Sequence, residues 1–313
     1  MEQAEIKVSP AKRSERRNRL ARREALNGYA FFSPWLFGFL VFTAGPVLYS
    51  LYLSFTSYDT LSSPKWIGIM NYKVLLTQDA TFWKSLYNTL YYVVFSVPLG
   101  LIIGVLLAML MNQKVPGIRF FRTVFYLPSV VSGVAVALLW MWLLDPSFGL
   151  INTTLAKFGI QGPGWLTDVD WSKPSLILMS LWGVGGSMII YLAGLQGIPR
   201  DLYEASRVDG AGAVRQFWRI TLPLLTPTIF YNLIMGLLGG FQVFLQSFVM
   251  TNGGPVDSTL FYALYLYNKA FKSSQMGYAS AMAWILLVLT LICTLIVLRT
   301  SKKWVYYEGA ENK

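Results

Sequence analysis

Histidine is absent from this sequence of 313 residues, and cysteine occurs once, at Cys293. One cysteine cannot form a disulfide within the chain, and without histidine the sequence offers no zinc-type ligand set. No G-x-x-x-x-G-K-[ST] string is present, so the chain has no P-loop for ATP. These absences exclude a disulfide-stabilised domain and a P-loop ATPase, and they predict a chain with no metal or cofactor of its own.

Charge is also scarce. Charged residues are 13% of the chain and hydrophobic residues 55%, whereas about 25% of a soluble domain is charged. Six stretches carry no charge, at residues 25–58, 85–113, 123–144, 174–199, 220–256 and 273–298. Each can supply the roughly 20 apolar residues that cross a bilayer as a helix. The sequence therefore predicts an all-α integral membrane protein with six transmembrane helices.

The predicted spans contain no Asp, Glu, Lys, Arg or His. Carriers driven by protons or sodium usually place ionisable groups inside the membrane, and no catalytic set of side chains can be assembled in these spans. The chain is therefore predicted to be neither an ion-coupled carrier nor an enzyme. Any transport must draw its energy from another chain.

The distribution of Lys and Arg predicts the orientation in the membrane. With the N-terminus inside, the cytoplasmic segments hold 19 of the 26 Lys and Arg residues, and such an excess marks the cytoplasmic side. Both termini and the segment at 199–227 are then cytoplasmic. The net charge of +11 follows mostly from this bias and does not indicate nucleic-acid binding. The basic N-terminal tail favours contact with anionic membrane lipid.

Residues 199–227 form the most polar interruption between two of the apolar runs. The first half has apolar residues at helical spacing: Leu202, Ala205 and Val208. The second half carries another apolar stripe: Val214, Phe217 and Trp218. The Asp-Gly-Ala-Gly string at 209–212 should break the helix between them, with Gly210 as the elbow. Pro223 is expected to end the second helix.

This segment resembles the EAA loop of membrane permeases in bacterial ABC importers. The residues that carry the resemblance are Glu204, Ala205, Ser206, Asp209, Gly210, Ala211, Phe217, Ile220, Leu222, Pro223 and Pro227. Ser206 stands where the family has its second alanine, which is another small residue. The alternative is an amphipathic loop that lies on the bilayer surface without a protein partner.

The resemblance implies the type I ABC importer permease fold and the sugar-permease group, of the maltose and glycerol-phosphate type. In that family the loop forms coupling helices that dock into a cleft of a separate cytoplasmic ATPase, which binds ATP and Mg. Glu204 would be the acceptor in that cleft, and Phe217 and Trp218 would pack at the dock or against the spans.

The resemblance also implies the partners: a second permease, expected to be a different chain, two copies of the ATPase and an extracytoplasmic solute-binding protein. It places the chain in the bacterial cytoplasmic membrane. The large extra external domain of the maltose permease is missing from this sequence, so contacts with the binding protein must come from short loops.

Three regions follow along the chain: a cytoplasmic basic tail at 1–28, a six-span permease domain at 29–299 and a cytoplasmic C-terminal tail at 300–313. We expect span three at about 123–144, span four at about 174–196, and span five from near Pro227 to about 251. The charge-free spans favour a neutral solute, because a charged one would lack a counter-charge.

Polar groups, aromatic faces and glycines in spans three to five are the candidate substrate pathway. They are Ser129, Ser132, Gly133, Met179, Trp182, Gly183, Gly186, Gly239, Phe241, Gln242 and Gln246. Trp and Phe faces can stack on sugar rings, and amides can bond hydroxyls. The alternative for the glycines is close helix packing.

The sequence predicts the permease subunit of an ATP-driven importer of a neutral sugar or oligosaccharide. A sugar-phosphate or polyol importer of the same type is the alternative substrate class. Two other classes are a channel, which would need no docking loop for an ATPase, and a membrane scaffold without transport, which would need no glycine-rich polar seam through its spans.

Overall fold

The computed structural model describes residues 10–306, with side chains from residue 22 onward. Its helices are α1 (Pro10–Phe39), α2 (Gly45–Ser54), α3 (Met70–Thr77), α4 (Ala80–Met111), α5 (Ile118–Tyr126), α6 (Gly133–Leu143), α7 (Leu150–Lys157), α8 (Val169–Trp182), α9 (Gly185–Gly197), α10 (Arg200–Val208), α11 (Ala213–Gln216), α12 (Leu222–Phe241), α13 (Tyr262–Tyr267) and α14 (Met276–Ser301). Two short antiparallel strands, β1 (Thr56–Ser57) and β2 (Lys65–Trp66), pair between α2 and α3.

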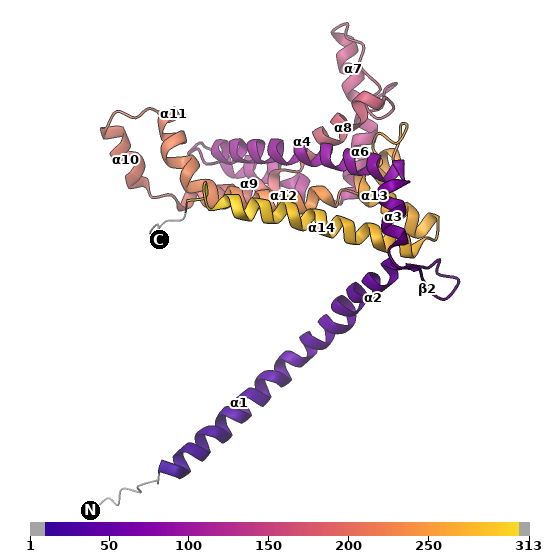
Figure 1. The fold of residues 1–313 in the computed structure, drawn as a ribbon. Helices are drawn as coiled ribbons and strands as arrows, with labels where there is room; N and C mark the ends of the chain where they lie inside the picture. Colours follow the sequence, from indigo (N-terminus) through magenta and orange to yellow (C-terminus); the bar gives the residue numbers. More distant parts are fainter. Residues whose placement is uncertain (1–9, 307–313) are drawn as a thin grey trace, which may run out of the picture.

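The centre of the molecule is a layered helix bundle in which α4 packs against α8, α9 and α12, and α12 packs against α14 (Figure 1). Asp79 caps α4, because its carboxylate accepts a hydrogen bond from the Phe82 amide at 2.9 Å. Most of the buried side chains between the helices are apolar. At one end of the bundle, Tyr191 and Met188 of α9 pack with Leu225 of α12.

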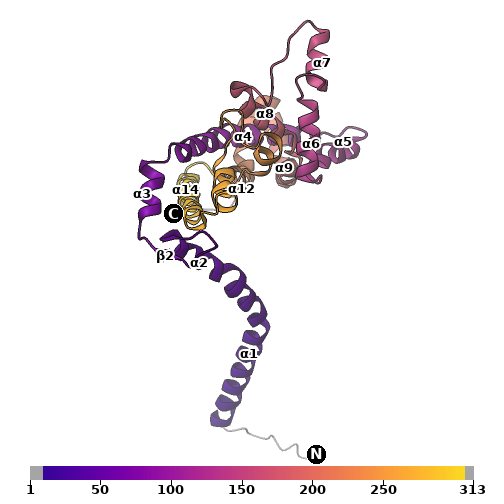
Figure 2. The same cartoon turned by 90° about the vertical axis from the view of Figure 1, so that its right-hand side faces the viewer.

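The first helix leaves the bundle. Residues 10–54 form one continuous helical rod with a single π-helical turn at Leu40–Ala44, and only its α2 end lies on α14 (Figures 1 and 2). The predicted basic tail is therefore helical from residue 10 and continuous with span one, while residues 1–9 lie outside the described part of the chain. Many aromatic side chains of the rod are exposed, among them Phe31, Trp35 and Phe42.

Among the described residues, four helices are long and apolar enough to cross a bilayer, and two bent helix pairs could each serve as one further span. The prediction of six spans agrees with this upper count. Spans three and four are bent helix pairs, a feature that the predicted bounds did not include. The helical segment 118–129 and α6 meet at 96° across residues 130–132, and α8 and α9 meet at 48° across residues 183–184. Pro128 lies in the 3-10 turn Leu127–Ser129 just before the first break, where its missing N–H and its ring prevent α5 from continuing as an α-helix.

Span five also differs from the prediction. The helix begins at Ala213, within the elbow, and runs without a stop to Phe241, so Pro223 does not end it. A π-helical turn at Phe217–Thr221 precedes α12, and the Leu222 amide closes it on the Phe217 carbonyl. Pro223 therefore lies in the first turn of α12, directly after the π-helical turn, where a missing N–H is tolerated. At its other end the helix breaks at 242–244 and resumes at 245 as a short segment that ends in a π-helical turn at Ser247–Thr251.

Candidate functional site: a protruding elbow and an uncharged cavity

The elbow between α10 and α11 projects beyond one end of the bundle (Figure 1). Gly210 has φ +75°, in the left-handed region. The Ala211 amide bonds the Ser206 carbonyl at 2.8 Å, and the Gly210 amide bonds the Arg207 carbonyl at 3.0 Å. This pair of bonds is the Schellman arrangement, which ends a helix at a left-handed glycine. The prediction that Gly210 makes the elbow is consistent with this geometry.

A polar clasp, which we define as Tyr203, Ser206, Gln216 and Thr221, holds the two arms of the elbow together. The side-chain amide of Gln216 donates to Ser206 Oγ at 2.9 Å and to the Tyr203 carbonyl at 3.3 Å. The hydroxyls of Tyr203 and Thr221 share a hydrogen bond of 2.8 Å. Gln216 and Thr221 are buried. The angle between the arms is therefore fixed by side chains and not by the backbone of the turn alone.

The outer face of the elbow is apolar and open to solvent. Val208 is 89% exposed, Val214 73% and Trp218 61%. Glu204, Ala205 and Asp209 are also exposed on the same elbow. Exposed apolar side chains gathered at the tip of a protruding loop are typical of a protein contact.

The remaining predicted coupling residues lie closer to the bundle. Phe217 is half-buried and packs edge-on against the Trp218 ring at 5.3 Å. Ile220 packs on the buried cluster around Tyr191. Ala211 and Pro223 are half-buried. Phe217 and Ile220 therefore join the exposed tip to the spans.

A cavity of about 540 Å³ opens between α4, the α8–α9 pair and the broken end of α12. Its described lining contains no charged residue. The polar groups that line it are Tyr92, Ser96, Ser180, Ser187, Asn232, Gln242 and Gln246. Gln242 stands at the point where α12 ends. Irregular backbone at membrane depth is tolerated where it lines a cavity, and broken helices form the substrate sites of many transporters.

The glycines of α12 divide between packing and the cavity. A Cβ on Gly240 would lie 3.0 Å from Val93 Cγ2, and one on Gly236 would lie 3.1 Å from Val97 Cγ1. Gly239, by contrast, would meet nothing within 4 Å. Close packing on α4 thus accounts for Gly236 and Gly240, whereas Gly239 borders open space in the cavity.

The other predicted pathway residues lie outside the lining of this cavity. Met179 and Phe241 are buried in the packing between helices. A Cβ on Gly186 would lie 3.8 Å from Ser129 Cβ, so the breaks of spans three and four meet there. Ser132 occupies the N-cap position of α6 without a side-chain capping bond, and Gly133 faces the Leu245 side chain. Trp182 is 39% exposed and packs edge-on against Trp140 beside Gly183.

Sequence reasoning missed five residues of the cavity and one of the clasp: Tyr92, Ser96, Ser180, Ser187, Asn232 and Gln216. Asn232 could have been noticed, because it is an amide in the middle of an apolar run of 37 residues without charge. The three serines, Tyr92 and Gln216 carry no such signal. Serine is tolerated throughout membrane helices, and only the packing shows which serines face a cavity.

A family model described as "Binding-protein-dependent transport system inner membrane component" matches residues 96–305, which include the cavity and the elbow. The chain belongs to this family. The predicted resemblance to the permeases of ABC importers is thereby confirmed, and the six-span chain is a multi-pass membrane permease subunit.

Relatives of known sequence match this chain over nearly its whole length. It is 46% identical over 301 residues to the probable ABC transporter permease protein YesP of Bacillus subtilis (strain 168), covering 95% of this chain and 97% of the relative. It is 35% identical over 291 residues to the lactose transport system permease protein LacF of Rhizobium radiobacter, covering 90% and 95%.

The crystal structure of a bacterial ABC transporter involved in the import of the acidic polysaccharide alginate contains a chain that is 28% identical, with a TM-score of 0.79, covering 92% of this chain and 99% of that one. A second structure of an alginate transporter, in complex with a pentasaccharide-bound periplasmic protein, gives 27% and 0.78, covering 90% and 96%. The predicted type I ABC importer permease fold is confirmed.

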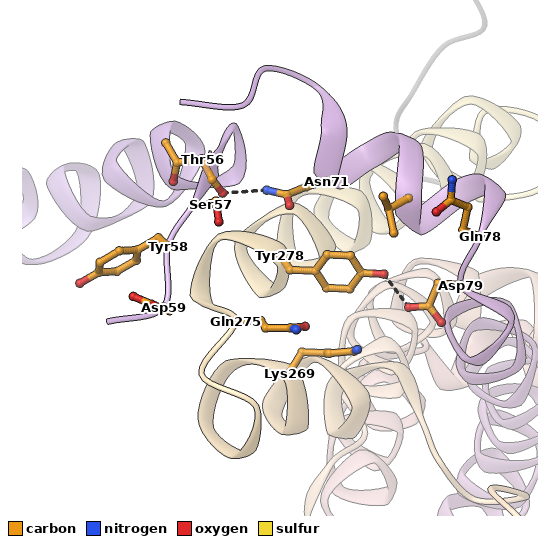
Figure 3. A pocket seen from close by; sticks show the side chains of 11 residues that line it. Thr56, Ser57, Tyr58, Asp59, Asn71, Gln78, Asp79, Lys269, Gln275 and Tyr278 are labelled. Carbon is orange, nitrogen blue, oxygen red and sulfur yellow. Dashed lines mark hydrogen bonds between the residues drawn. The ribbon is translucent and has the colours of Figure 1, made fainter. Parts of the chain in front are cut away.

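At the end of the permease opposite the elbow, a cavity of about 500 Å³ lies between β1, α3 and the start of α14 (Figure 3). Asp79 Oδ2 accepts hydrogen bonds from the hydroxyls of Tyr265 and Tyr278, both at 2.6 Å. The ammonium of Lys269 lies over both tyrosine rings, 5.4 and 5.2 Å from their centroids. These contacts join the start of α4 to α13 and α14, which are more than 180 residues away along the chain.

The pKa of Asp79 is lowered from its ordinary value. Burial opposes ionisation of the carboxyl, but the hydrogen bonds from Tyr265 and Tyr278 and from the Phe82 amide, with the charge of Lys269, outweigh it. Asp79 is therefore ionised at neutral pH, and the two tyrosines act as donors.

Proposed function

We propose that this permease carries a neutral sugar or oligosaccharide and that a separate cytoplasmic ATPase drives it by docking on the elbow. Sugars are named for several relatives, among them the multiple sugar-binding system of Streptococcus mutans serotype c (strain ATCC 700610 / UA159) and the lactose system above. A sugar or oligosaccharide importer permease is the function that these relatives support. The neutrality of the solute and the coupling through the elbow are argued from this chain's own residues.

The elbow is the observation that carries the proposal. It carries Glu204 and three exposed apolar side chains, Val208, Val214 and Trp218, and its helices lie beyond the end of the bundle. The Schellman turn and the clasp hold both arms in one geometry. A rigid arm can transmit a displacement of the ATPase to α12, because the helix that starts in the elbow at Ala213 continues to Gln242 at the cavity.

The uncharged cavity supports a neutral solute. Hydroxyls and amides can replace the water that a sugar loses, whereas a carboxylate or phosphate would find no opposite charge among the described lining residues. The volume of about 540 Å³ falls within the range of about 300–1,000 Å³ for small-ligand sites. An acidic saccharide or a sugar phosphate would require a cation from a second permease chain.

The protruding first helix supports a partner permease. The rod from residue 22 to residue 39 exposes Phe31, Trp35 and other aromatic side chains away from the bundle of its own chain. We place both termini and the elbow in the cytoplasm of the bacterial cell and the cavity of Figure 3 on the outer face. A solute-binding protein would then contact the short loops around α3, α7 and α13. ATP and Mg would be bound by two copies of the ATPase, and this chain would hold neither.

Reconstitution of the permease with its partner permease, ATPase and binding protein tests the proposal. We expect a neutral oligosaccharide to stimulate ATP hydrolysis and uptake, and a uronate oligosaccharide or a sugar phosphate of similar size to do neither. Stimulation by the acidic solutes would refute the neutral specificity. Assembly and uptake without any contribution from the elbow, measured with the Glu204 variant described below, would refute the coupling.

A further inference from the structure

A third cavity, of about 710 Å³, lies at the end of the bundle that carries the elbow. It is bounded by the turn after α4, the start of α5, the end of α9 and the inner side of α10. Its volume falls within the range of small-ligand sites. The function proposed above uses Glu204, which also lines this cavity, but gives its cationic side chains no role.

The cavity is strongly basic. Four cationic side chains line it: Lys114, Arg122, Arg200 and Arg207. Among the described lining residues Glu204 is the one carboxylate. The side chains come from three separate segments, the turn at 112–117, α5 and α10, so the fold and not one helix face brings them together. A concave site with this excess of positive charge favours an anion.

Arg122 is held in place before any ligand arrives. Its Nε and one terminal nitrogen donate to the Met111 carbonyl at 3.1 and 2.7 Å, and the residue is half-buried. These two hydrogen bonds to the last residue of α4 fix the plane of the guanidinium. Arginine has five N–H groups, so three remain for a ligand.

The surroundings favour a phosphoryl group over other anions. Arginine and lysine recognise phosphate oxygens by paired and point-charge contacts respectively. Asn112, Gln113 and Gln196 add amides that can bond neighbouring hydroxyls. The apolar side chains of Ile118, Leu195 and Ile198 form the remaining wall.

The position of α5 favours a lipid as the source of the phosphoryl group. Phe120, Phe121 and Val124 of α5 are exposed next to the cavity, and an amphipathic helix of this kind lies at the boundary between water and acyl chains. Basic pockets at the cytoplasmic ends of membrane helices are suited to the headgroups of anionic phospholipids. A soluble phosphate compound from the cytoplasm would offer the same chemistry without the acyl chains.

We propose that the cavity binds a phosphoryl group through Lys114, Arg122, Arg200 and Arg207, supplied by an anionic phospholipid of the inner leaflet. The headgroup would bridge the α4–α5 turn to α10. Because Arg200 and Arg207 lie on the same helix as Glu204, the occupant would set the position of the coupling helix relative to the spans. The inner-leaflet location and this effect on coupling rest on the proposed function, whereas phosphoryl binding does not.

The test uses the full chain, alone and in its assembled complex, in nanodiscs of phosphatidylcholine with phosphatidylglycerol. The variant is Lys114→Gln/Arg200→Gln, which keeps Arg122 and its bond to Met111. The matched control is Arg119→Gln/Lys302→Gln, which removes two exposed cations of the same end that do not line the cavity. Native mass spectrometry counts the retained phosphatidylglycerol. We expect the wild type and the control to retain it about tenfold or more better than the variant, because only the cations that line the cavity would bond the bound phosphoryl group, and each such charged hydrogen bond contributes about tenfold.

A second arm separates the two sources of the phosphoryl group. Inorganic phosphate is titrated into the detergent-purified chain, with sodium chloride at equal ionic strength as reference, and the thermal midpoint is followed. If phosphate stabilises the wild type and the control but not the variant while lipid retention is equal in all three, the site stands and its ligand is a soluble phosphate.

Equal lipid retention and equal phosphate response in all three proteins would overturn the proposal. A lipid difference that disappears in the assembled complex would also overturn it, because side chains of a partner would then fill the cavity. No nucleotide is present in either arm. Failure of ATPase docking by the Glu204 variant would therefore leave these results unchanged, and the two proposals can fail separately.

Discussion

The side-chain amide of Gln216 donates to Ser206 Oγ at 2.9 Å, across the turn that separates α10 from α11. Ser206 in turn donates to the Tyr203 carbonyl at 2.9 Å, so one hydroxyl serves both as donor within α10 and as acceptor between the arms. The family pattern has alanine at this position, which could make neither bond. The serine of this chain is thus part of the clasp that fixes the elbow.

Ser206→Ala should loosen the clasp without unfolding the permease. Gln216 would keep its weaker bond to the Tyr203 carbonyl, and the loss should be about 0.5–1.5 kcal/mol. Gln216→Leu should cost a similar amount, and the two changes together should cost less than their sum. A double-mutant cycle on the affinity for the ATPase measures this coupling. Full additivity would show that the bond does not contribute to docking.

Gly210→Val should misdirect α11, because a side chain at φ +75° costs about 1–2 kcal/mol. The strain comes from the backbone alone, since a Cβ at Gly210 would meet nothing within 4 Å. Gly212→Val is the matched control, with φ −74° and equally open space. We expect ATP hydrolysis without coupled uptake in the first variant and normal coupling in the second. Equal behaviour of the two would show that the left-handed turn is not needed.

Glu204→Ala should weaken association with the ATPase and lower uptake, with normal insertion into the membrane. The reason is that an acceptor desolvated in a docking cleft leaves its partner unpaired when it is removed, at a cost of about 1–3 kcal/mol. Asp201→Ala, on the exposed first turn of the same helix, is the control and should change little. Co-purification with the ATPase measures both. Wild-type association of the Glu204 variant would remove the proposed role.

Gln242→Ala should lower uptake or change the sugar preference, with solute-stimulated ATPase activity falling in parallel. An amide that bonds a solute hydroxyl should be worth about 1–3 kcal/mol, whereas an interhelical bond in a membrane averages only about 0.6 kcal/mol. Single cysteines at Gln242 and Trp182 in a Cys293→Ser background test the pathway directly. We expect a small polar thiol reagent to label both and a solute to protect them. Labelling at Gln242 alone would confine the pathway to the cavity and exclude Trp182.

Acidification should destabilise the junction of α4 with α13 and α14. The pKa of Asp79 is lowered in the folded chain, so its stabilising contribution is present above the ordinary value of 3.8 and is lost as the pH falls through the lower folded value. Asp79→Asn should lower the free energy of unfolding by about 1–3 kcal/mol at neutral pH. Below about pH 4 the variant should lose less stability than the wild type. Thermal unfolding from pH 7 to pH 3 measures this. A parallel pH dependence in wild type and variant would assign the acid sensitivity to other groups.

The matched control for this change is Asp170→Asn. Asp170 is exposed in the first turn of α8 and accepts no side-chain hydrogen bond from a tyrosine. Its loss should leave the thermal unfolding midpoint at neutral pH, and the decrease of that midpoint at low pH, close to those of the wild type. A shift as large as that of Asp79→Asn would point to the net charge of the outer loops and not to the tyrosine contacts.

Local chemistry allowed much of the fold to be predicted. Charge-free runs marked the segments that cross the bilayer, because a charged side chain in hydrocarbon is costly wherever it lies. Gly210 was predictable as the elbow, because a left-handed break between two amphipathic helices requires glycine. The breaks were harder. Pro128 interrupts its helix, yet Pro223 does not, because a π-helical turn ahead of it removes the conflict.

The sequence by itself determined which segments lie in the membrane, which one protrudes from it and which family the chain resembles, since each depends on residue type and spacing. The tertiary structure decided which of two adjacent glycines packs closely against α4. Gly240 packs on Val93 and Gly239 borders open space, and this difference depends on how α12 is rotated against α4. It also decided the clasp and the basic cavity, because Ser206 and Gln216, or Lys114 and Arg200, meet only through the path of the backbone between them.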